Sequence, residues 1–386
     1  MAGPLAGIKA IDFGRAAVGP VALSWLAHLG ADVIKVEPPE GDGVRGQGGP
    51  PAMQGMGTTF MGNNVGKRGI VLNLKDPADK EVALKLVAVA DVAIDNFRSN
   101  EVMVRLGMGY DVLSKINPRL VYVQSSAYGN KGPLKGTSTG EWSVQAYSGY
   151  TSVVGKPGGR AEFNRGTANL DWNGAMVNAQ ALLVALYMRE KTGKGVFIET
   201  NQGQAGITLG STRIAEYFAT GTPPAPMGSG RPNIVPDQAF STLDGYINLT
   251  VIHDGFWPKL CKAINRADLM EEPRFSTNQL RVENREELIP MLEQVFRGKS
   301  SAEWLYILKK HDVPCGEYFQ DRLLSHNLMD QEQVRSNNLL QKVDTPWGKM
   351  NSTNAHWNFS KTPAGTSRSA PELDQHHDEI IADWLK

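Results

Sequence analysis

Residues 8–37, IKAIDFGRAAVGPVALSWLAHLGADVIKVE, decide the fold class of this chain. Residues 8–12 alternate in polarity and residues 32–37 are rich in β-branched side chains, so both segments predict strands. Between them, residues 21–29 predict a helix that ends at Gly30, a residue type that commonly terminates helices. A strand, a helix and a second strand form a βαβ unit, in which we expect the strands to be parallel.

The alternation of strands and helices continues downstream. It predicts strands over residues 70–74, 91–96, 120–125 and 196–199, and helices over residues 77–90 and 172–189. Such alternation is typical of a doubly wound α/β domain around a parallel sheet. We therefore predict the α/β fold class.

A change of composition marks the second part of the chain. Residues 221–236 are rich in proline and glycine, which favours a linker. A smaller α+β domain follows, with a predicted strand over residues 245–251 and helices over residues 255–264, 285–296 and 302–311. From about residue 347 the sequence is polar and irregular until a final helix over residues 374–385. We expect a large domain over residues 1–220, and a linker and small domain over residues 221–330.

Composition argues against several classes of protein. The 386 residues include 40 basic and 40 acidic side chains, so no basic excess points to nucleic acid or to an anionic membrane. Two cysteines, Cys261 and Cys315, make no disulfide framework, and the seven histidines do not cluster at metal-site spacings. The N-terminus lacks a signal-peptide pattern and no apolar run approaches the ~20 residues of a membrane span, so we expect a cytoplasmic protein.

The loop after the first predicted strand, residues 14–19, has the sequence GRAAVG. It lacks the middle glycine of the dinucleotide pattern GxGxxG and the GK[ST] of a P-loop, which argues against both sites. Glu37, at the end of the second strand, is therefore better explained as a surface residue than as a ribose ligand. A loop leading into a helix at the carboxyl edge of a sheet still suits an anionic ligand.

Asn96, Phe97 and Arg98 follow a predicted buried strand at its carboxyl end, where open α/β sheets bind ligands. A guanidinium group can hold phosphate through two hydrogen bonds, and an aromatic ring can cover an adenine. On spacing alone, a capped loop with a surface arginine is the simpler interpretation.

Asp171 directly precedes the predicted helix over residues 172–189. Aspartate is a favoured N-cap, and the helix dipole and free N–H groups are expected to keep its carboxylate ionised and to lower its pKa. An ionised carboxylate on a rigid element can act as a covalent nucleophile, and no GxSxG sequence offers a serine in its place. Taken alone, the position favours a helix cap over a nucleophile.

Longer segments match one family in order along nearly the whole chain. They include PLAGIKAIDF (4–13), LAHLGADVIKVEPPEGD (26–42), NVGKRGIVLNLKDP (64–77), DVAIDNFR (91–98), QAYSGYTSVVG (145–155) and RPNIVPDQAFSTLDGYINL (231–249). In these segments the chain resembles the family III CoA-transferases, the group of formyl-CoA, carnitine-CoA and related enzymes.

The resemblance implies a Rossmann-like large domain, a smaller α+β domain, and a C-terminal segment over residues 331–386 that returns to the large domain. It implies two open-ring chains interlocked as a homodimer, a CoA thioester as substrate, and no tightly bound cofactor. The family's nucleophilic aspartate matches Asp171, and its glycine-rich cover loop matches Gly228-Ser229-Gly230. Its CoA-binding positions match Leu72, Lys75, Asn96, Phe97, Arg98 and Arg105.

The family mechanism implies that Asp171 attacks the acyl-CoA, and that anhydride and aspartyl-CoA thioester intermediates pass the CoA to a carboxylic acid acceptor. The alternative on the same fold is an α-methylacyl-CoA racemase, which pairs the aspartate with a histidine. The histidine position falls on Gly140, which cannot move a proton, so the sequence favours the transferase. A non-catalytic CoA-binding protein is disfavoured by the presence of Asp171. The donor, the acceptor and the role of Glu141 stay open.

Overall fold

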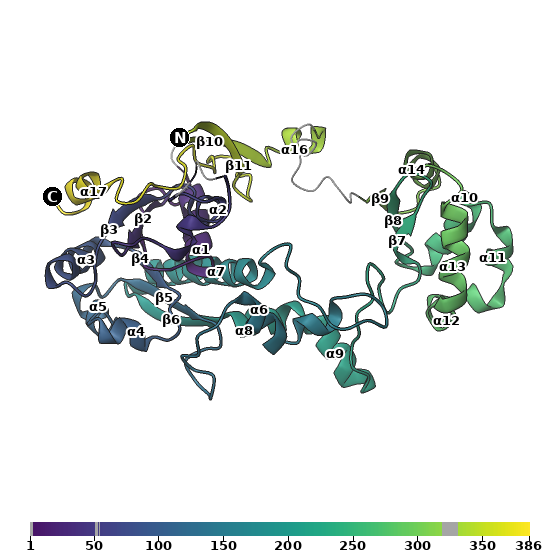
Figure 1. Ribbon diagram of the computed structural model, residues 1–386, viewed down its shortest axis with the longest axis horizontal. Coiled ribbons are helices and arrows are strands. Elements are labelled where there is room, and N and C mark those ends of the chain that lie inside the picture. Colours follow the sequence, from purple (N-terminus) through teal and green to yellow (C-terminus); the bar gives the residue numbers. More distant parts are fainter. Residues whose placement is uncertain (1–2, 51–52, 54, 319–330) are drawn as a thin grey trace. The chain divides into compact units, whose positions relative to one another are not determined.

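The computed structural model describes residues 3–50, 53, 55–318 and 331–386. The chain divides into two compact units, each with its own elements (Figure 1). The larger unit comprises Met1–Thr151, Phe163–Pro223 and Glu332–Lys386, and the smaller unit comprises Ser152–Glu162 and Pro224–Gln331. Among the helices of the described part of the chain, none is both long enough and apolar enough to cross a membrane.

A six-stranded parallel sheet forms the centre of the larger unit, in the order β3-β2-β1-β4-β5-β6. Its strands are β1 (Lys9–Asp12), β2 (Asp32–Glu37), β3 (Arg68–Val71), β4 (Val92–Asp95), β5 (Val121–Ser126) and β6 (Val196–Asn201). Ile11 of β1 pairs with Ile34 of β2 on one side and with Ala93 of β4 on the other. The strand order therefore reverses between β1 and β4, and ligands of doubly wound folds bind at such a reversal. The predicted α/β class is confirmed.

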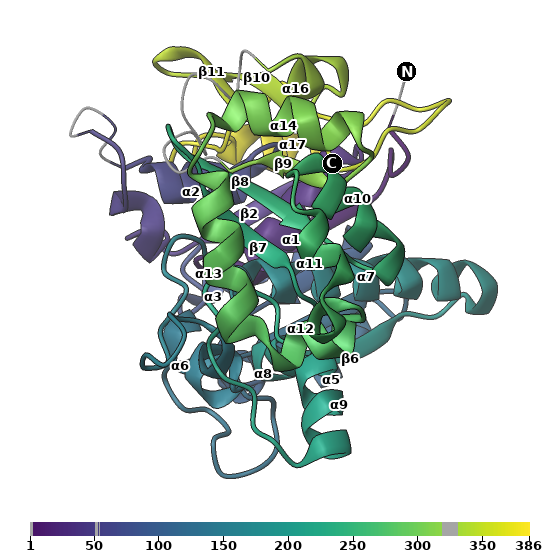
Figure 2. The same cartoon turned by 90° about the vertical axis from the view of Figure 1, so that its right-hand side faces the viewer.

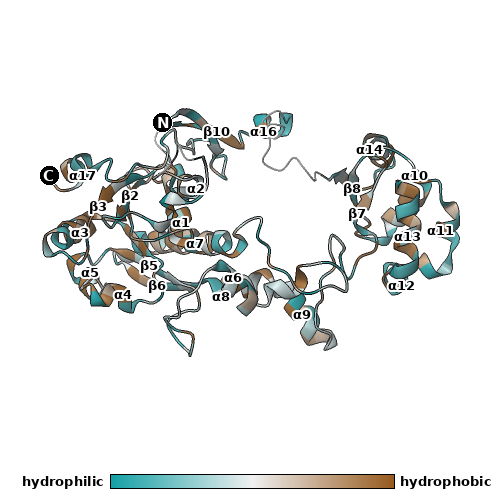
Figure 3. Cartoon of the chain, in the orientation of Figure 1, coloured by the Kyte–Doolittle hydropathy of each residue, from teal (hydrophilic) through white to brown (hydrophobic). Residues whose placement is uncertain are grey.

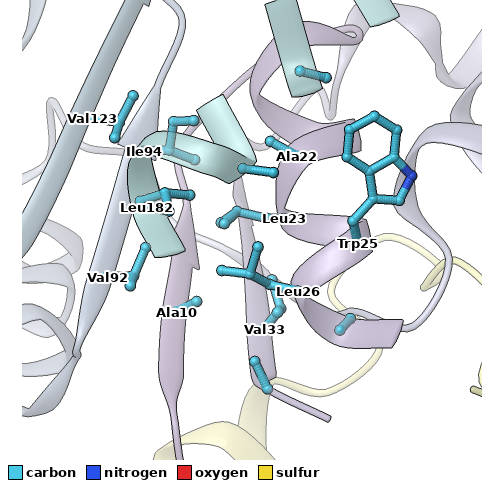
Figure 4. Close-up of a cluster of buried hydrophobic side chains, with 14 of the residues drawn as sticks. Ala10, Ala22, Leu23, Trp25, Leu26, Val33, Val92, Ile94, Val123 and Leu182 are labelled. Atoms are coloured by element: carbon cyan, nitrogen blue, oxygen red, sulfur yellow. The ribbon is translucent and has the colours of Figure 1, made fainter. Parts of the chain in front are cut away.

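Helices cover both faces of this sheet because its buried strands are apolar on both sides. The helices of the larger unit are α1 (Val18–His28), α2 (Thr58–Asn64), α3 (Pro77–Val89), α4 (Glu101–Arg105), α5 (Tyr110–Ile116), α6 (Glu141–Tyr147), α7 (Asn169–Thr192), α8 (Gln202–Leu209), α9 (Ser211–Thr220), α16 (Glu332–Ser336) and α17 (His377–Trp384). On one face, Leu26 of α1 and Leu182 of α7 cluster with Ile94 of β4 (Figure 4). On the other, α3, α5 and α17 contribute to a second cluster that includes Leu86 and Trp384. Hydrophobic stretches run along β2 and β3 in Figure 3.

A buried ionic network lies beneath the loop that follows β1. Lys67 Nζ donates to Asp12 Oδ2 at 2.7 Å, and Lys35 Nζ donates to Asp42 Oδ2 at 3.0 Å. All four side chains are buried, and a buried charge is tolerated only when it is paired and hydrogen-bonded. Asp42 also accepts a hydrogen bond from the backbone N–H of Ala16 at 3.0 Å. The network therefore fixes the loop at the reversal point of the sheet.

The smaller unit is built on an antiparallel sheet of β7 (Asp237–Ser241), β8 (Tyr246–Thr250) and β9 (Cys315–Glu317). Its helices are α10 (Trp257–Ala263), α11 (Ala267–Glu271), α12 (Asn278–Glu283), α13 (Arg285–Phe296) and α14 (Ser301–Lys310) (Figure 2). Its core contains aromatic rings, with the centroids of Phe240 and Phe296 5.0 Å apart and those of Phe296 and Trp304 5.1 Å apart. This unit thus combines strands and helices in the α+β manner.

Two stretches of backbone differ from the sequence prediction. Ser152–Glu162, expected within the large domain, groups with the smaller unit, where Gly228 N donates to Gly155 O at 2.9 Å. The region predicted as irregular from residue 347 contains part of a hairpin, formed by β10 (Leu340–Thr345) and β11 (Gly348–Thr353). The hairpin is polar and its strands carry no clear hydrophobic alternation, so the pattern that predicts strands is absent.

Candidate active site

Two adjacent pockets open at the carboxyl edge of the parallel sheet. The first has a volume of about 270 Å³ and lies among the loops after β1, β4 and β5 and the first turns of α6, α7 and α8. The second has a volume of about 680 Å³ and lies among the loops after β1, β2, β3 and β4 and helix α4. We call them the aspartate pocket and the edge pocket. Arg15 lines both of them, so they share a wall.

The structure brings all of the predicted site residues to this edge but divides them between the two pockets. Asp171, Asn96 and Arg98 line the aspartate pocket. The edge pocket is lined by the other predicted residues, Leu72, Lys75, Phe97 and Arg105. Arg98 therefore lines the same pocket as the candidate nucleophile, although the two residues are far apart in the sequence.

Asp171 is the third residue of α7, because the helix begins at Asn169 and Ala168 occupies the N-cap position. The backbone N–H of Trp172 donates to Ala168 O at 3.0 Å, which extends the helix back past the aspartate. The prediction that Asp171 is the N-cap is therefore wrong. Its carboxylate is free for another role and accepts a hydrogen bond from Nε2 of Gln202 in α8.

The electrostatic surroundings of Asp171 also differ from expectation. Burial, together with the negative charge of Glu141, raises the pKa of Asp171 to about 7, although the hydrogen bond from Gln202 opposes the shift. The predicted lowering is wrong because desolvation of the carboxylate outweighs the field of the helix N-terminus. A carboxyl group that changes its charge near neutral pH inside a pocket is typical of functional sites.

Asn96 fixes the backbone of Arg15 across the reversal point. Its Oδ1 accepts from Arg15 N at 2.6 Å, and its Nδ2 donates to Arg15 O at 2.7 Å. Both ends of the Asn96 amide are thus engaged in holding the loop after β1, with the Arg15 side chain placed between the two pockets. Sequence reasoning did not single out Arg15 or Gln202; the one clue to Arg15 was its place in a loop suited to anions.

The wall that carries Phe97 is braced by buried polar groups. Asp95 Oδ1 accepts from Phe97 N at 3.0 Å, and Gln124 Nε2 donates to Phe97 O at 3.1 Å. Tyr122 Oη donates to Asp95 Oδ2 at 2.6 Å, and burial raises the pKa of Asp95 to about 6. These contacts hold the Phe97 backbone while its side chain lines the edge pocket.

Glu37 is neither the surface residue predicted nor placed as a ribose ligand. It is buried, and its Oε2 and Oε1 accept from Nε and Nη2 of Arg45 at 2.7 and 2.6 Å. The sequence did not reveal this pairing because a guanidinium eight residues further on folds back against the strand end. The pair fixes the carboxyl end of β2 beside the edge pocket.

Two further predictions concern the surroundings of the aspartate. Gly140 lines the aspartate pocket, and no histidine is among the described residues that line it. Gly228-Ser229-Gly230 lies in the smaller unit, where Ser229 Oγ accepts from Ala239 N at 3.2 Å. Its role as a cover loop stays a prediction.

Comparisons with known proteins agree on one family. The model of CoA-transferase family III matches residues 5–377. The chain is 31% identical over 385 residues to human succinyl-CoA:glutarate CoA-transferase, covering 99% of this chain and 86% of that protein. It is 36% identical over 315 residues to acetyl-CoA:oxalate CoA-transferase of Acetobacter aceti, covering 81% and 80%.

A structural comparison points the same way. The crystal structure of a CAIB/BAIF family protein from Brucella suis matches with a TM-score of 0.86 at 30% identity and covers 100% of both chains. Since the family model spans nearly the full length and the named relatives are CoA-transferases, the chain belongs to the family III CoA-transferases, enzymes that use CoA thioesters as substrates.

Proposed function

We propose that this enzyme moves CoA from an acyl-CoA donor to a carboxylic acid acceptor with Asp171 as covalent nucleophile. The observation that carries the proposal is the carboxylate of Asp171 in a small pocket that adjoins a larger pocket lined by Lys75 and Arg105. The larger pocket suits the charged part of CoA, because its cations can pair with phosphates and the ring of Phe97 can cover an adenine.

The chemistry proceeds through four exchanges at one carboxyl group. The Asp171 carboxylate attacks the thioester carbonyl, the C–S bond breaks, and a mixed anhydride and CoA thiolate form. The thiolate attacks the aspartyl carbonyl and releases the donor acid, leaving an aspartyl-CoA thioester. The acceptor carboxylate displaces the thiolate to form a second anhydride, and the thiolate then takes the acceptor acyl group and frees Asp171. Each step replaces one acyl bond by another, so no difficult direct exchange is needed.

For the acceptor, we propose a short acid that carries a second carboxylate. The aspartate pocket holds about 270 Å³ and is polar, with the guanidinium group of Arg15 and several hydroxyl side chains on its walls. Guanidinium groups pair well with carboxylates. Relatives named for glutarate, oxalate and mesaconate support the same class. A panel of mono- and dicarboxylic acids, assayed for CoA exchange from acetyl-CoA and succinyl-CoA, tests this choice.

We also propose that two chains assemble as an interlocked homodimer. Helix α7 packs one side against the sheet, and its other side exposes four large apolar residues, Met176, Val184, Tyr187 and Met188, around one polar residue, Gln180. A helix with apolar residues on every side is normally buried on every side. Phe218 of α9 is a further large apolar residue that is 80% exposed. A second copy of the chain is the cover that family membership suggests.

The role of Asp171 is tested by trapping the enzyme during turnover. Incubation with acyl-CoA and hydroxylamine should convert Asp171 to a hydroxamate, located by peptide mass spectrometry. Asp171→Asn keeps the size but lacks the anionic oxygen, so transfer should fall beyond the ~10²–10⁴-fold typical of losing an acid–base group. An adduct on a different residue, or a folded Asp171→Asn enzyme with near-normal transfer, contradicts the mechanism. Rapid entry of deuterium at the α-carbon of a 2-methylacyl-CoA would instead favour a racemase.

A further inference from the structure

Helix α7 has no capping side chain of its own at its N-terminus. Its N-cap residue, Ala168, has no hydrogen-bonding group in its side chain. The backbone N–H of Leu170, the second helical residue, instead donates to Glu141 Oε1 at 3.1 Å. The free N–H groups of a first helical turn need acceptors, and a negative charge near them is favourable. Glu141 belongs to α6, so one helix is capped by the side chain of another.

Glu141 is held firmly in this position. It is buried, and both of its carboxylate oxygens accept from Nε2 of Gln145 one turn further along α6, at 2.7 and 2.9 Å. The same Gln145 amide bonds both backbone groups of Asn164, with Nε2 to O at 2.9 Å and N to Oε1 at 3.0 Å. The segment that leads into α7 is therefore attached to α6 at Asn164 and again at Leu170.

The charged groups around Asp171 come from several elements. Glu141 of α6 lines the same pocket, as do Arg15 and Arg98 from the loops after β1 and β4. Gln202 of α8 is uncharged and donates to the Asp171 carboxylate. Helix α1 and strand β5 also line the pocket but contribute no charged side chain among the described residues. Glu141 is thus the one other carboxylate on the described walls of this pocket.

We propose that Glu141 is a positioning residue with two roles, capping the nucleophile helix from α6 and placing a second negative charge beside Asp171 that favours its acylation. The inference rests on Asp171 being the nucleophile. Two neighbouring carboxylates repel each other while both are ionised. Acylation of Asp171, as anhydride or as thioester, removes its charge and therefore this repulsion. Glu141 thus raises the free energy of the free enzyme relative to every covalent intermediate.

The two roles are separable by substitution. Glu141→Gln keeps an oxygen for the Leu170 N–H but removes the charge, whereas Glu141→Ala removes both. Glu190→Gln is the matched control, because it removes one acidic charge from the far end of α7, where the side chain is exposed.

Three measurements report on these variants. The first is titration of the Asp171 carboxyl carbon by ¹³C NMR in the free enzyme. The second is the fraction of enzyme trapped by hydroxylamine at saturating acyl-CoA. The third is hydrogen exchange of the Leu170 amide. In Glu141→Gln we expect the Asp171 titration to move down by about one pH unit and the trapped fraction, relative to free enzyme, to fall about tenfold, with Leu170 exchange unchanged. Glu141→Ala should show the same losses together with faster exchange at Leu170, and Glu190→Gln should match the parent enzyme.

The outcomes separate this inference from the proposed function. If the parent enzyme yields no hydroxamate at Asp171, the proposed nucleophile is wrong, while the NMR titration and the exchange at Leu170 still measure the cap and the charge. If the hydroxamate forms but Glu141→Gln leaves both the titration and the trapped fraction unchanged, the charge role of Glu141 is refuted. Unchanged exchange at Leu170 in a folded Glu141→Ala enzyme refutes the cap.

Discussion

Asp171 carries its charge in a pocket that disfavours it, so its ionisation should govern the pH dependence of transfer. With a pKa of about 7, the group is mostly protonated at pH 6 and mostly ionised at pH 8. Only the ionised carboxylate attacks the thioester, so kcat/KM should rise with pH to a plateau, with a midpoint near 7. Initial rates at subsaturating acyl-CoA between pH 5.5 and 9 measure this. A midpoint near 4 would show that the carboxyl group behaves as it does in water.

The same shift predicts that Asp171, the proposed nucleophile, destabilises the folded protein. The pKa of Asp171 is raised in the folded protein, so the folded state holds the proton more tightly than the unfolded chain, and stability falls as pH rises from about 4 to 7. Asp171→Asn removes this cost and should be more stable than the parent by about 1–3 kcal/mol at pH 8. Urea unfolding at pH 8 and at pH 4 tests this, because the gain should largely disappear at the lower pH.

Substitution of Arg98 should identify the part of the substrate that its guanidinium group binds. We expect Arg98→Ala to raise the KM for CoA thioesters more than it lowers kcat, because a charge that binds ground and transition states alike changes mainly KM. Measuring acetyl-CoA and succinyl-CoA as donors sharpens the test, with Arg105→Ala of the edge pocket as comparison. A rise in KM for both donors supports a CoA contact. A rise for succinyl-CoA alone would contradict it and place Arg98 against the acyl carboxylate.

At the scale of the element, α17 completes the cover of the sheet face that α3 and α5 also cover. Trp384 is buried, and its Nε1 donates to Asp32 Oδ2 of β2 at 2.8 Å. Arg68 of β3 pairs with Asp383 of the same helix at 2.8 Å. The end of the chain therefore supports the strands from which the walls of the edge pocket extend.

The buried side chain of Trp384 should therefore stabilise the fold more than the ion pair between Arg68 and Asp383. Trp384→Ala should destabilise the larger unit by about 3–5 kcal/mol, because it empties a buried aromatic site. Asp383→Ala removes an exposed partner and should cost about 1 kcal/mol or less. Chemical unfolding followed by circular dichroism compares the two. Equal losses would mean that charge, rather than packing, holds α17.

At the scale of the whole molecule, the exposed apolar side of α7 should decide the state of assembly. Light scattering at micromolar concentration should give about twice the chain mass of 42.0 kDa. Val184→Asp places a charge on that surface, where Val184 is 58% exposed, and should lower the mass toward that of one chain without loss of helix. Glu190→Gln on the same helix is the control and should keep the parent mass. A stable and active single chain in the parent protein would refute the dimer.

Much of the sheet follows from local sequence. The predicted strands over residues 32–37, 91–96 and 120–125 match β2, β4 and β5 within one residue at each end. These strands are rich in apolar and β-branched residues because helices cover both faces of the sheet. Such a composition can be recognised from a short run of consecutive residues. The carboxyl-edge position of Asn96-Phe97-Arg98 follows from the same reasoning, since a residue just after a parallel strand must lie at that edge.

The state of the site depends on contacts that no local pattern contains. Arg15 and Asn96 are 81 positions apart, yet their mutual hydrogen bonds set the wall between the pockets. Glu141 and Leu170 are 29 positions apart, and their contact places a carboxylate beside Asp171. The sequence by itself therefore determined the α/β class, the sheet edge at which the candidate site residues lie, and the residue types available there. Only the tertiary structure decided which of those residues share a pocket and how they ionise, because burial and electrostatic fields are sums over groups that are distant in sequence and close in space.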